Sequence, residues 1–231
     1  MRNEFVEAVK ANQPEFEVEL SDPIIERLVD YYAIILEHNP ILHLVGPCTP
    51  AEFAVRHILE SLALLEHLPE AAQFADVGTG AGFPSIPCLI ARPDISATLI
   101  ESREKKARFL ADAVEKLGLG GRVEIVNRQF QEIRGRRFKI VTCRALEKFG
   151  ERIQLLIERF SPERMLLFGG PSLAEKLMQL DLQFEAKLLP LSRERFLYIV
   201  KNQTFSQLNR AGAEPRLSKQ RRIRRKNHPR G

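Results

Sequence analysis

From residue 73 to residue 201 the chain alternates short runs of β-forming residues with longer stretches of helical periodicity. This alternation limits the fold most strongly, because parallel strands need long crossover connections and right-handed helical crossovers supply them. We therefore expect an α/β fold, doubly wound around a mostly parallel, seven-stranded sheet. Strands are predicted near 73–77, 96–101, 122–126, 138–142, 163–168, 182–189 and 194–201, and helices near 84–92, 103–117, 147–159 and 171–178. The last two β runs are joined by only four residues, which predicts an antiparallel final strand.

Residues 1–70 show helical periodicity alone, so an N-terminal helical layer is expected there. The first helix is predicted over 2–11. A second begins at Asp22-Pro23 and should stop before Pro40, because a proline interrupts the helical hydrogen-bond pattern. Thr49 and Glu52 form a capping-box pattern for a third helix. We divide the chain into a helical region (1–70), a main domain (71–205) and a basic tail (206–231).

Basic residues are concentrated at the C-terminal end. Residues 216–231 contain eight Lys and Arg residues and no acidic residue, whereas residues 1–215 hold the other 27 basic residues and all 30 acidic ones. The net charge of +5 therefore belongs to the tail and not to the folded body. Such a tail is either a solvated terminus or an arm that gathers RNA phosphates. The RNA interpretation assigns this role to Arg221, Arg222, Arg224, Arg225 and Lys226.

The cellular context follows from what the sequence lacks. No apolar run is long enough to cross a bilayer, and the N-terminal residues do not resemble a secretion signal. Three scattered cysteines, Cys48, Cys88 and Cys143, form no paired spacing of a zinc site or a disulfide framework. We expect a cytoplasmic protein without a metal or a membrane partner.

A glycine-rich loop follows the first predicted strand, with Gly78, Gly80 and Gly82 on alternate positions. In doubly wound sheets, ligands bind at the carboxyl ends of strands near the switch in strand order. The spacing excludes two common loops: Phe83 occupies the place of the third dinucleotide-binding glycine, and no lysine follows for a phosphate loop. The loop suits a ligand whose carboxylate, ribose and adenine lie against bare backbone.

Glu101 ends the second predicted strand, 23 residues after Gly78. An acid at roughly this distance typically accepts the hydroxyl hydrogens of a ribose. Glu101 also suits the start of the following helix, where the helix dipole stabilises negative charge, and the two roles are compatible.

Several ordered motifs give the chain a specific family resemblance. The sequences DVGTGAGFPSIP, TLIESREKKARFLADAVEKLGL and VTCRAL, preceded by YYAIILEHNPILHLVG and RHILESL, closely resemble the bacterial 16S ribosomal RNA guanine-N7 methyltransferases, also called glucose-inhibited division protein B. The resemblance spans roughly residues 25–200. It implies a Rossmann-like, class I S-adenosylmethionine-dependent methyltransferase that acts on 16S rRNA or the small ribosomal subunit. We expect the protein to be a monomer.

The resemblance also implies a set of cofactor-binding residues. Gly78 and Phe83 match cofactor-contacting positions of the family, Glu101 stands where the family usually has Asp, and Arg144 matches an arginine of the cofactor pocket. The family's adenine-contacting pair corresponds to Gln129 and Phe130, in a segment one residue longer than usual. Ser85 replaces the usual glycine, and His38-Asn39 replaces a Trp-Asn pair.

The implied reaction fits a sequence without an obvious acid–base pair. Guanine N7 carries no proton, so its methylation requires alignment of the reactants and no general base. Arg56, Arg108 and Arg144 are candidates to meet RNA phosphates around the pocket, with no catalytic role assigned beyond positioning by Arg144. His57 either contacts a base or is a helix histidine bonded to backbone, and the structural role is favoured.

Two alternatives stay open on the sequence alone. A nicotinamide-dependent oxidoreductase would share the sheet, although Phe83 disfavours a dinucleotide. A ribosome-binding module that kept the fold but lost its activity would have no use for both the glycine loop and Glu101.

Overall fold

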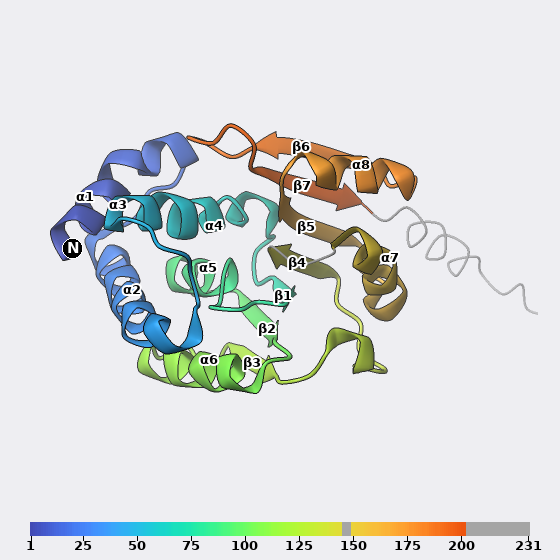
Figure 1. The fold of residues 1–231 in the computed structure, drawn as a ribbon, viewed down its shortest axis with the longest axis horizontal. Coiled ribbons are helices and arrows are strands. Elements are labelled where there is room, and N and C mark those ends of the chain that lie inside the picture. The colour runs from blue at the N-terminus through green and yellow to red at the C-terminus, as the bar shows by residue number, and fades with distance from the viewer. Residues whose placement is uncertain (145–148, 202–231) are drawn as a thin grey trace, which may run out of the picture.

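The computed structural model describes residues 1–144 and 149–201, and side chains within 145–151 are left aside. Its centre is a seven-stranded sheet in the order β3-β2-β1-β4-β5-β7-β6 (Figure 1). The strands are β1 (Gln73–Val77), β2 (Ser96–Ile100), β3 (Val123–Val126), β4 (Ile140–Arg144), β5 (Arg164–Gly169), β6 (Phe184–Leu188) and β7 (Phe196–Lys201). β1 pairs in parallel with both β2 and β4, and β7 runs antiparallel to both β5 and β6. The predicted fold class, with its antiparallel final strand, is confirmed.

The helices cover both faces of the sheet because side chains alternate along each strand. On one face, Phe74 joins a core with the N-terminal helices, α5 (Ser85–Ala91) and α6 (Glu104–Lys116). On the other, Ala75 and Val77 pack in a second core with α7 (Phe149–Phe160) and α8 (Pro171–Gln179). Figure 1 shows α7 and α8 well away from the N-terminal helices. The N-terminal layer thus shares a core with the sheet.

The N-terminal layer consists of α1 (Arg2–Asn12), η1 (Gln13–Phe16), α2 (Asp22–Leu42) and a continuous helical stretch. That stretch comprises α3 (Pro50–Phe53), the π-helical segment η2 (Ala54–Leu59) and α4 (Glu60–Leu62), with η3 (Leu65–His67) after it. The predicted capping box is present, since Thr49 Oγ1 accepts from the Glu52 backbone and the Glu52 carboxylate accepts from Thr49 N at 2.8 Å. A short η4 (Phe130–Glu132) follows β3.

The predicted end of α2 before Pro40 is wrong, because the helix continues to Leu42. Proline already has a helical φ, and its missing N–H removes one hydrogen bond of the last turn. Asn39 stabilises this end by bonding both the N–H and the carbonyl of Val45 through its side chain. The helix closes at His43, whose φ of 48° is left-handed and whose N–H bonds Asn39 O.

Candidate cofactor site

The glycine loop turns at the carboxyl end of β1, where the strand order reverses between β1 and β4. Gly78 and Gly80 have φ values of 71° and 59°, in the left-handed region that favours glycine. The N–H of Gly78 bonds Ile100 O at 2.8 Å, which ties the loop to the end of β2. The loop therefore lies at the switch point where ligands bind in this architecture.

Buried polar groups support the loop from below. Tyr31 of α2, fully buried, donates its hydroxyl hydrogen to Ala81 O at 2.6 Å. Asp76, also fully buried, accepts from the hydroxyls of Thr79 and Ser85 on one carboxylate oxygen, each at 2.7 Å. Ser85, which departs from the family's glycine, thus has a structural role. The other oxygen of Asp76 has no partner among the described residues, and burial raises the pKa of this carboxyl to about 7.

Glu101 joins the glycine loop to the following helix. Its two carboxylate oxygens accept from Gly80 N at 3.0 Å and from Arg103 N at 2.8 Å, and the residue is 6% exposed. Glu101 therefore lies beside the loop and also next to the start of α6, which is compatible with both of its expected roles. Each oxygen keeps a further lone pair for a hydroxyl donor.

A cavity of about 460 Å³ opens between these segments. Its walls are the glycine loop, the loop after α2, residues 101–103 with Lys106, and the residues His57, Arg144 and Arg152. Among the described lining residues Glu101 is the sole carboxylate, whereas Arg103, Lys106, Arg144 and Arg152 are cationic. The site thus combines a bare backbone turn, one acid and a cationic rim.

His57 lies in the π-helical segment and stacks on Phe83, with ring centroids 5.1 Å apart and an interplanar angle of 28°. Burial and the nearby Arg144, Arg56 and Arg195 lower the pKa of His57 to about 3. The imidazole is therefore neutral at physiological pH. The site holds it as an aromatic, uncharged wall next to Phe83, which is itself 7% exposed.

The structure brings Gly78, Gly80, Phe83, Glu101, Arg144 and His57 to this one cavity. It places the other candidates elsewhere. Gly82 belongs to the packing of the loop, because a Cβ there would lie 2.4 Å from Ile86 Cδ1 and 3.0 Å from the Tyr31 hydroxyl. Gln129 is exposed and Phe130 is buried in the second core. Neither is among the cavity's described lining residues.

The residues predicted to contact RNA also lie in different places. The exposed Arg56 meets the site through its backbone carbonyl, which accepts from Arg144, and Arg108 forms an exposed ion pair with Glu104 one turn away on α6. The basic tail lies outside the described residues. Arg103, Lys106 and Arg152 line the cavity and were not singled out for it from the sequence. For Arg103 and Lys106, the sequence feature that could have indicated this position is the cluster of cations after Glu101, which also suits a solvated helix face.

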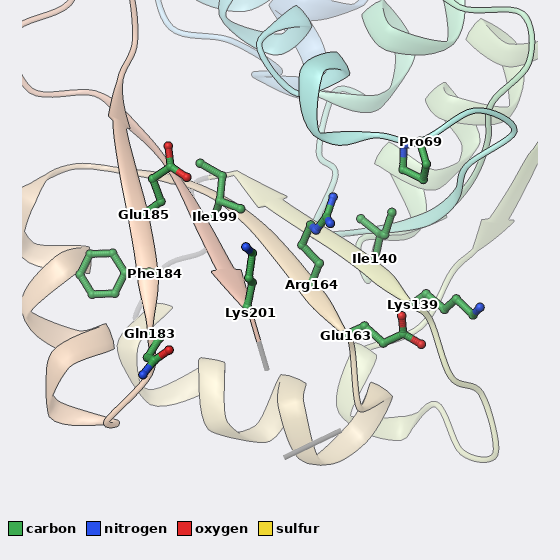
Figure 2. A pocket seen from close by; sticks show the side chains of 10 residues that line it. All are labelled: Pro69, Lys139, Ile140, Glu163, Arg164, Gln183, Phe184, Glu185, Ile199 and Lys201. Atoms are coloured by element: carbon green, nitrogen blue, oxygen red, sulfur yellow. The ribbon is translucent and has the colours of Figure 1, made fainter. Parts of the chain in front are cut away.

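A larger cavity, of about 710 Å³, lies at the opposite end of the parallel strands (Figure 2). Lys139 and Glu163 directly precede β4 and β5, so this cavity borders the amino ends of the parallel strands. Ligands of doubly wound sheets bind at the carboxyl ends, so size does not decide between the two cavities. In residues 1–144 and 149–201, no helix is long and apolar enough to cross a membrane. Within the same ranges, no three metal-ligating side chains gather.

Comparisons with known proteins agree with this geometry. The sequence model of the family described as "rRNA small subunit methyltransferase G" matches residues 24–195. A relative of that name from Sorangium cellulosum is 33% identical over 86% of this chain and 85% of its own length. Another, from Pelotomaculum thermopropionicum, is 40% identical, but the match spans 49% of this chain and about half of that relative, 48%. A solved structure of a SAM-dependent methyltransferase from Aquifex aeolicus shares the fold, with a TM-score of 0.51 at 18% identity over 67% of this chain and 94% of that one.

The fold, the site and the matching family model define a Rossmann-like methyltransferase, for which the family resemblance implies S-adenosylmethionine as the cofactor. Within that class, the chain belongs to the rRNA small subunit methyltransferase G family.

The described residues fit this cofactor on chemical grounds. The glycine loop offers backbone without side chains, Glu101 offers acceptors for ribose hydroxyls, and Arg144 offers a cation for the cofactor's carboxylate. The unpartnered oxygen of Asp76 adds a buried acceptor beneath the loop.

Proposed function

We propose that this chain transfers a methyl group from S-adenosylmethionine to N7 of a guanine in the 16S rRNA of the small ribosomal subunit. The observation that carries the choice of N7 is the lack of a free general base among the described lining residues of the pocket. Of these residues, only Glu101 and His57 carry a carboxylate or an imidazole, the side chains that commonly serve as general bases. Glu101 is engaged by two backbone N–H groups. His57 has a pKa of about 3, so it is too weak a base to remove a proton from an acceptor.

This absence of a strong base suits an acceptor atom that has no proton to lose. Guanine N7 is a lone pair exposed on the major-groove edge of the base. An exocyclic amine or a hydroxyl must lose a proton when it is methylated, and that proton needs an acceptor. The proposed alternatives are weaker: Phe83 disfavours a dinucleotide, and an inactive module has no need for the intact pocket.

The residues of the chain have separate roles in this proposal. Glu101 and the backbone of Gly78 and Gly80 hold the nucleoside end of the cofactor, Arg144 holds its anionic end, and Phe83 with His57 forms an apolar wall. When bound, the cofactor supplies an electrophilic methyl group on a sulfonium. We retain Gln129 and Phe130 as proposed adenine contacts, which would require η4 to rearrange, because Phe130 is buried in the core.

The cationic rim supports an RNA substrate. Arg103, Lys106 and Arg152 surround the cavity with positive charge, and phosphate contacts of this kind position a nucleic acid without reading its sequence. We extend this role to Arg56, Arg108 and the basic tail, including Arg221, Arg222, Arg224, Arg225 and Lys226. The proposal places the chain in the cytoplasm as a monomer, where small subunits are assembled.

The test is methyl transfer to small ribosomal subunits purified from cells that lack this protein. The full chain is incubated with labelled S-adenosylmethionine, and the modified nucleotide is located by mass mapping. We expect one N7-methylguanine in 16S rRNA. A methyl group on another atom, or none with both naked rRNA and whole subunits, would overturn the proposal. The Gly78→Asp variant is the control, because its carboxylate would occupy the cofactor's space and abolish transfer.

A further inference from the structure

Glu60 is a buried carboxylate shared by two arginines. It begins α4, is 1% exposed, and lies outside the described lining of the cofactor cavity. Its Oε1 accepts from Arg195 Nε at 2.7 Å, and its Oε2 accepts from Arg144 Nη2 at 3.2 Å. A buried charge is retained only when it is well paired, so this carboxylate depends on both partners.

Within the described residues, the hydrogen bonds of the Arg144 side chain all go to one short segment of the N-terminal layer. Besides Glu60, its guanidinium donates to the Arg56 carbonyl and to Ser61 Oγ at 3.3 Å. Residues 56–61 cover the last four residues of the π-helical segment and the start of α4. A π-helical turn displaces backbone carbonyls from their α-helical partners and is frequent at functional sites. Here the Arg56 carbonyl faces a cation at the end of β4.

These bonds fix the direction of the Arg144 side chain and leave some of its N–H donors available to a ligand. A guanidinium has five N–H donors, and the bonds to Arg56, Glu60 and Ser61 occupy three of them. The group also lies 5.7 Å from the centroid of the Phe168 ring. Counted over the described residues, two N–H donors of Arg144 remain, and Arg144 lines the cofactor cavity.

We propose that Glu60 is a positioning residue for cofactor binding: it orients Arg144 so that its remaining donors meet the carboxylate of the cofactor. This inference rests on the proposed role of Arg144 in the site. Glu60 acts through Arg144 and does not itself touch the ligand. The N-terminal helical layer is therefore part of the cofactor site, through the segment from Arg56 to Ser61.

The experiment is a double-mutant cycle on cofactor affinity. Binding of S-adenosylhomocysteine to the full chain is measured by calorimetry for the wild type, Glu60→Gln, Arg144→Met and the double variant. We expect Glu60→Gln to weaken binding about tenfold, because one hydrogen bond to a charged group is lost and the amide turns a donor toward an arginine. Arg144→Met should weaken binding at least as much. The double variant should bind like Arg144→Met alone, because the effect of Glu60 passes through Arg144.

A purely structural role of Glu60 gives a different pattern. It predicts a lower unfolding temperature with unchanged affinity, or losses that add in the double variant, and either result overturns the inference. Glu66→Gln is the matched control, since Glu66 is an exposed glutamate paired with Lys187 and should leave affinity unchanged. If Glu60→Gln does not fold, the cycle is run with Glu60→Asp, which keeps the charge and should give an intermediate loss.

The same cycle distinguishes this inference from the proposed function. Failure of the wild type to bind S-adenosylhomocysteine would remove the cofactor site itself. Unchanged affinity in Arg144→Met would remove Arg144 from that site, and the inference about Glu60 with it. Normal wild-type binding and a weakened Arg144→Met, with no effect of Glu60→Gln, would overturn the positioning role alone.

Discussion

The hydroxyl of Tyr31 donates a 2.6 Å hydrogen bond to the carbonyl oxygen of Ala81, fifty residues away in the glycine loop. The bond is buried, and the Tyr31 ring also packs against Phe83 at a centroid distance of 5.5 Å. A side chain of the N-terminal layer thus holds the backbone of the proposed cofactor site. The geometry of the loop depends on α2 as well as on its own glycines.

Removing this hydroxyl should loosen the loop. Tyr31→Phe leaves the buried Ala81 carbonyl without its donor, which costs about 1–3 kcal/mol of unfolding free energy. We also expect S-adenosylhomocysteine to bind roughly tenfold more weakly in calorimetry, the equivalent of about 1.4 kcal/mol. Tyr198→Phe is the matched control, because Tyr198 is also buried and donates to a carbonyl, Gly170 O, outside the loop. Equal affinities for the two variants would refute a role of Tyr31 in the site.

Gly82 should tolerate no side chain, for reasons of packing as well as conformation. Its φ is +99°, and a Cβ would overlap the buried Ile86 side chain and approach the Tyr31 hydroxyl. Gly82→Ala is expected to lower the unfolding free energy by roughly 2–5 kcal/mol, from backbone strain and overpacking together. Gly118→Ala is the control for strain alone, since Gly118 has a φ of +65° and open space around it. Denaturant unfolding that gives the same loss for both would contradict the packing argument.

His57 should remain neutral well below the pH at which histidine ordinarily gains a proton. Its folded-state pKa is lowered from 6.5 to about 3, because burial and three nearby arginines disfavour the imidazolium. Since the unfolded chain takes up the proton first, this group makes the protein less stable as pH falls from about 6.5 toward 3. NMR titration of the ring should show no midpoint between pH 5 and 8. A midpoint near 6.5 would place His57 in solvent and remove the argument for a weak base in the pocket.

The sequence predicted the sheet closely because the relevant signals are local. The runs near 73–77 and 96–101 became β1 and β2 with one residue's difference, and the short link before residue 194 marked the antiparallel end. The capping box at Thr49 was predicted for the same reason, since both partners lie within four residues. Pro40 misled because the side-chain bonds of Asn39 to Val45 stabilise this end of the helix, and the sequence gives no sign of them.

The site was predicted in part. Gly78 and Glu101 follow strands directly, so their meeting at one sheet edge could be inferred from topology. Tyr31 and Glu60 could not be found this way. Their partners, Ala81 and Arg144, are 50 and 84 residues away, and a tyrosine or glutamate at helical spacing gives no sign of what it will contact.

Asp76 should give the protein an unusual dependence of stability on pH. Its pKa is raised from 3.8 to about 7, first because burial disfavours the charged form. Between these values the unfolded chain loses the proton while the folded protein keeps it, so stability falls as pH rises from about 4 to 7 and then levels off. Asp76→Asn removes this titration. The unfolding free energy of the variant relative to the wild type should therefore rise by roughly 4 kcal/mol between pH 4 and pH 8.

The measurement is denaturant unfolding of both proteins at several pH values, without cofactor. We compare how the unfolding free energy of each protein changes with pH. This comparison cancels the separate cost of burying an amide, because that cost does not change with pH. Asp94→Asn should act in the opposite sense, since Arg92 and the Ala71 N–H hold the pKa of the exposed Asp94 below its usual range. Stability from Asp94 is present above the unfolded pKa and is lost in acid. Parallel curves for wild type and Asp76→Asn would mean that Asp76 is ionised throughout, with a cation or solvent at its unpartnered oxygen.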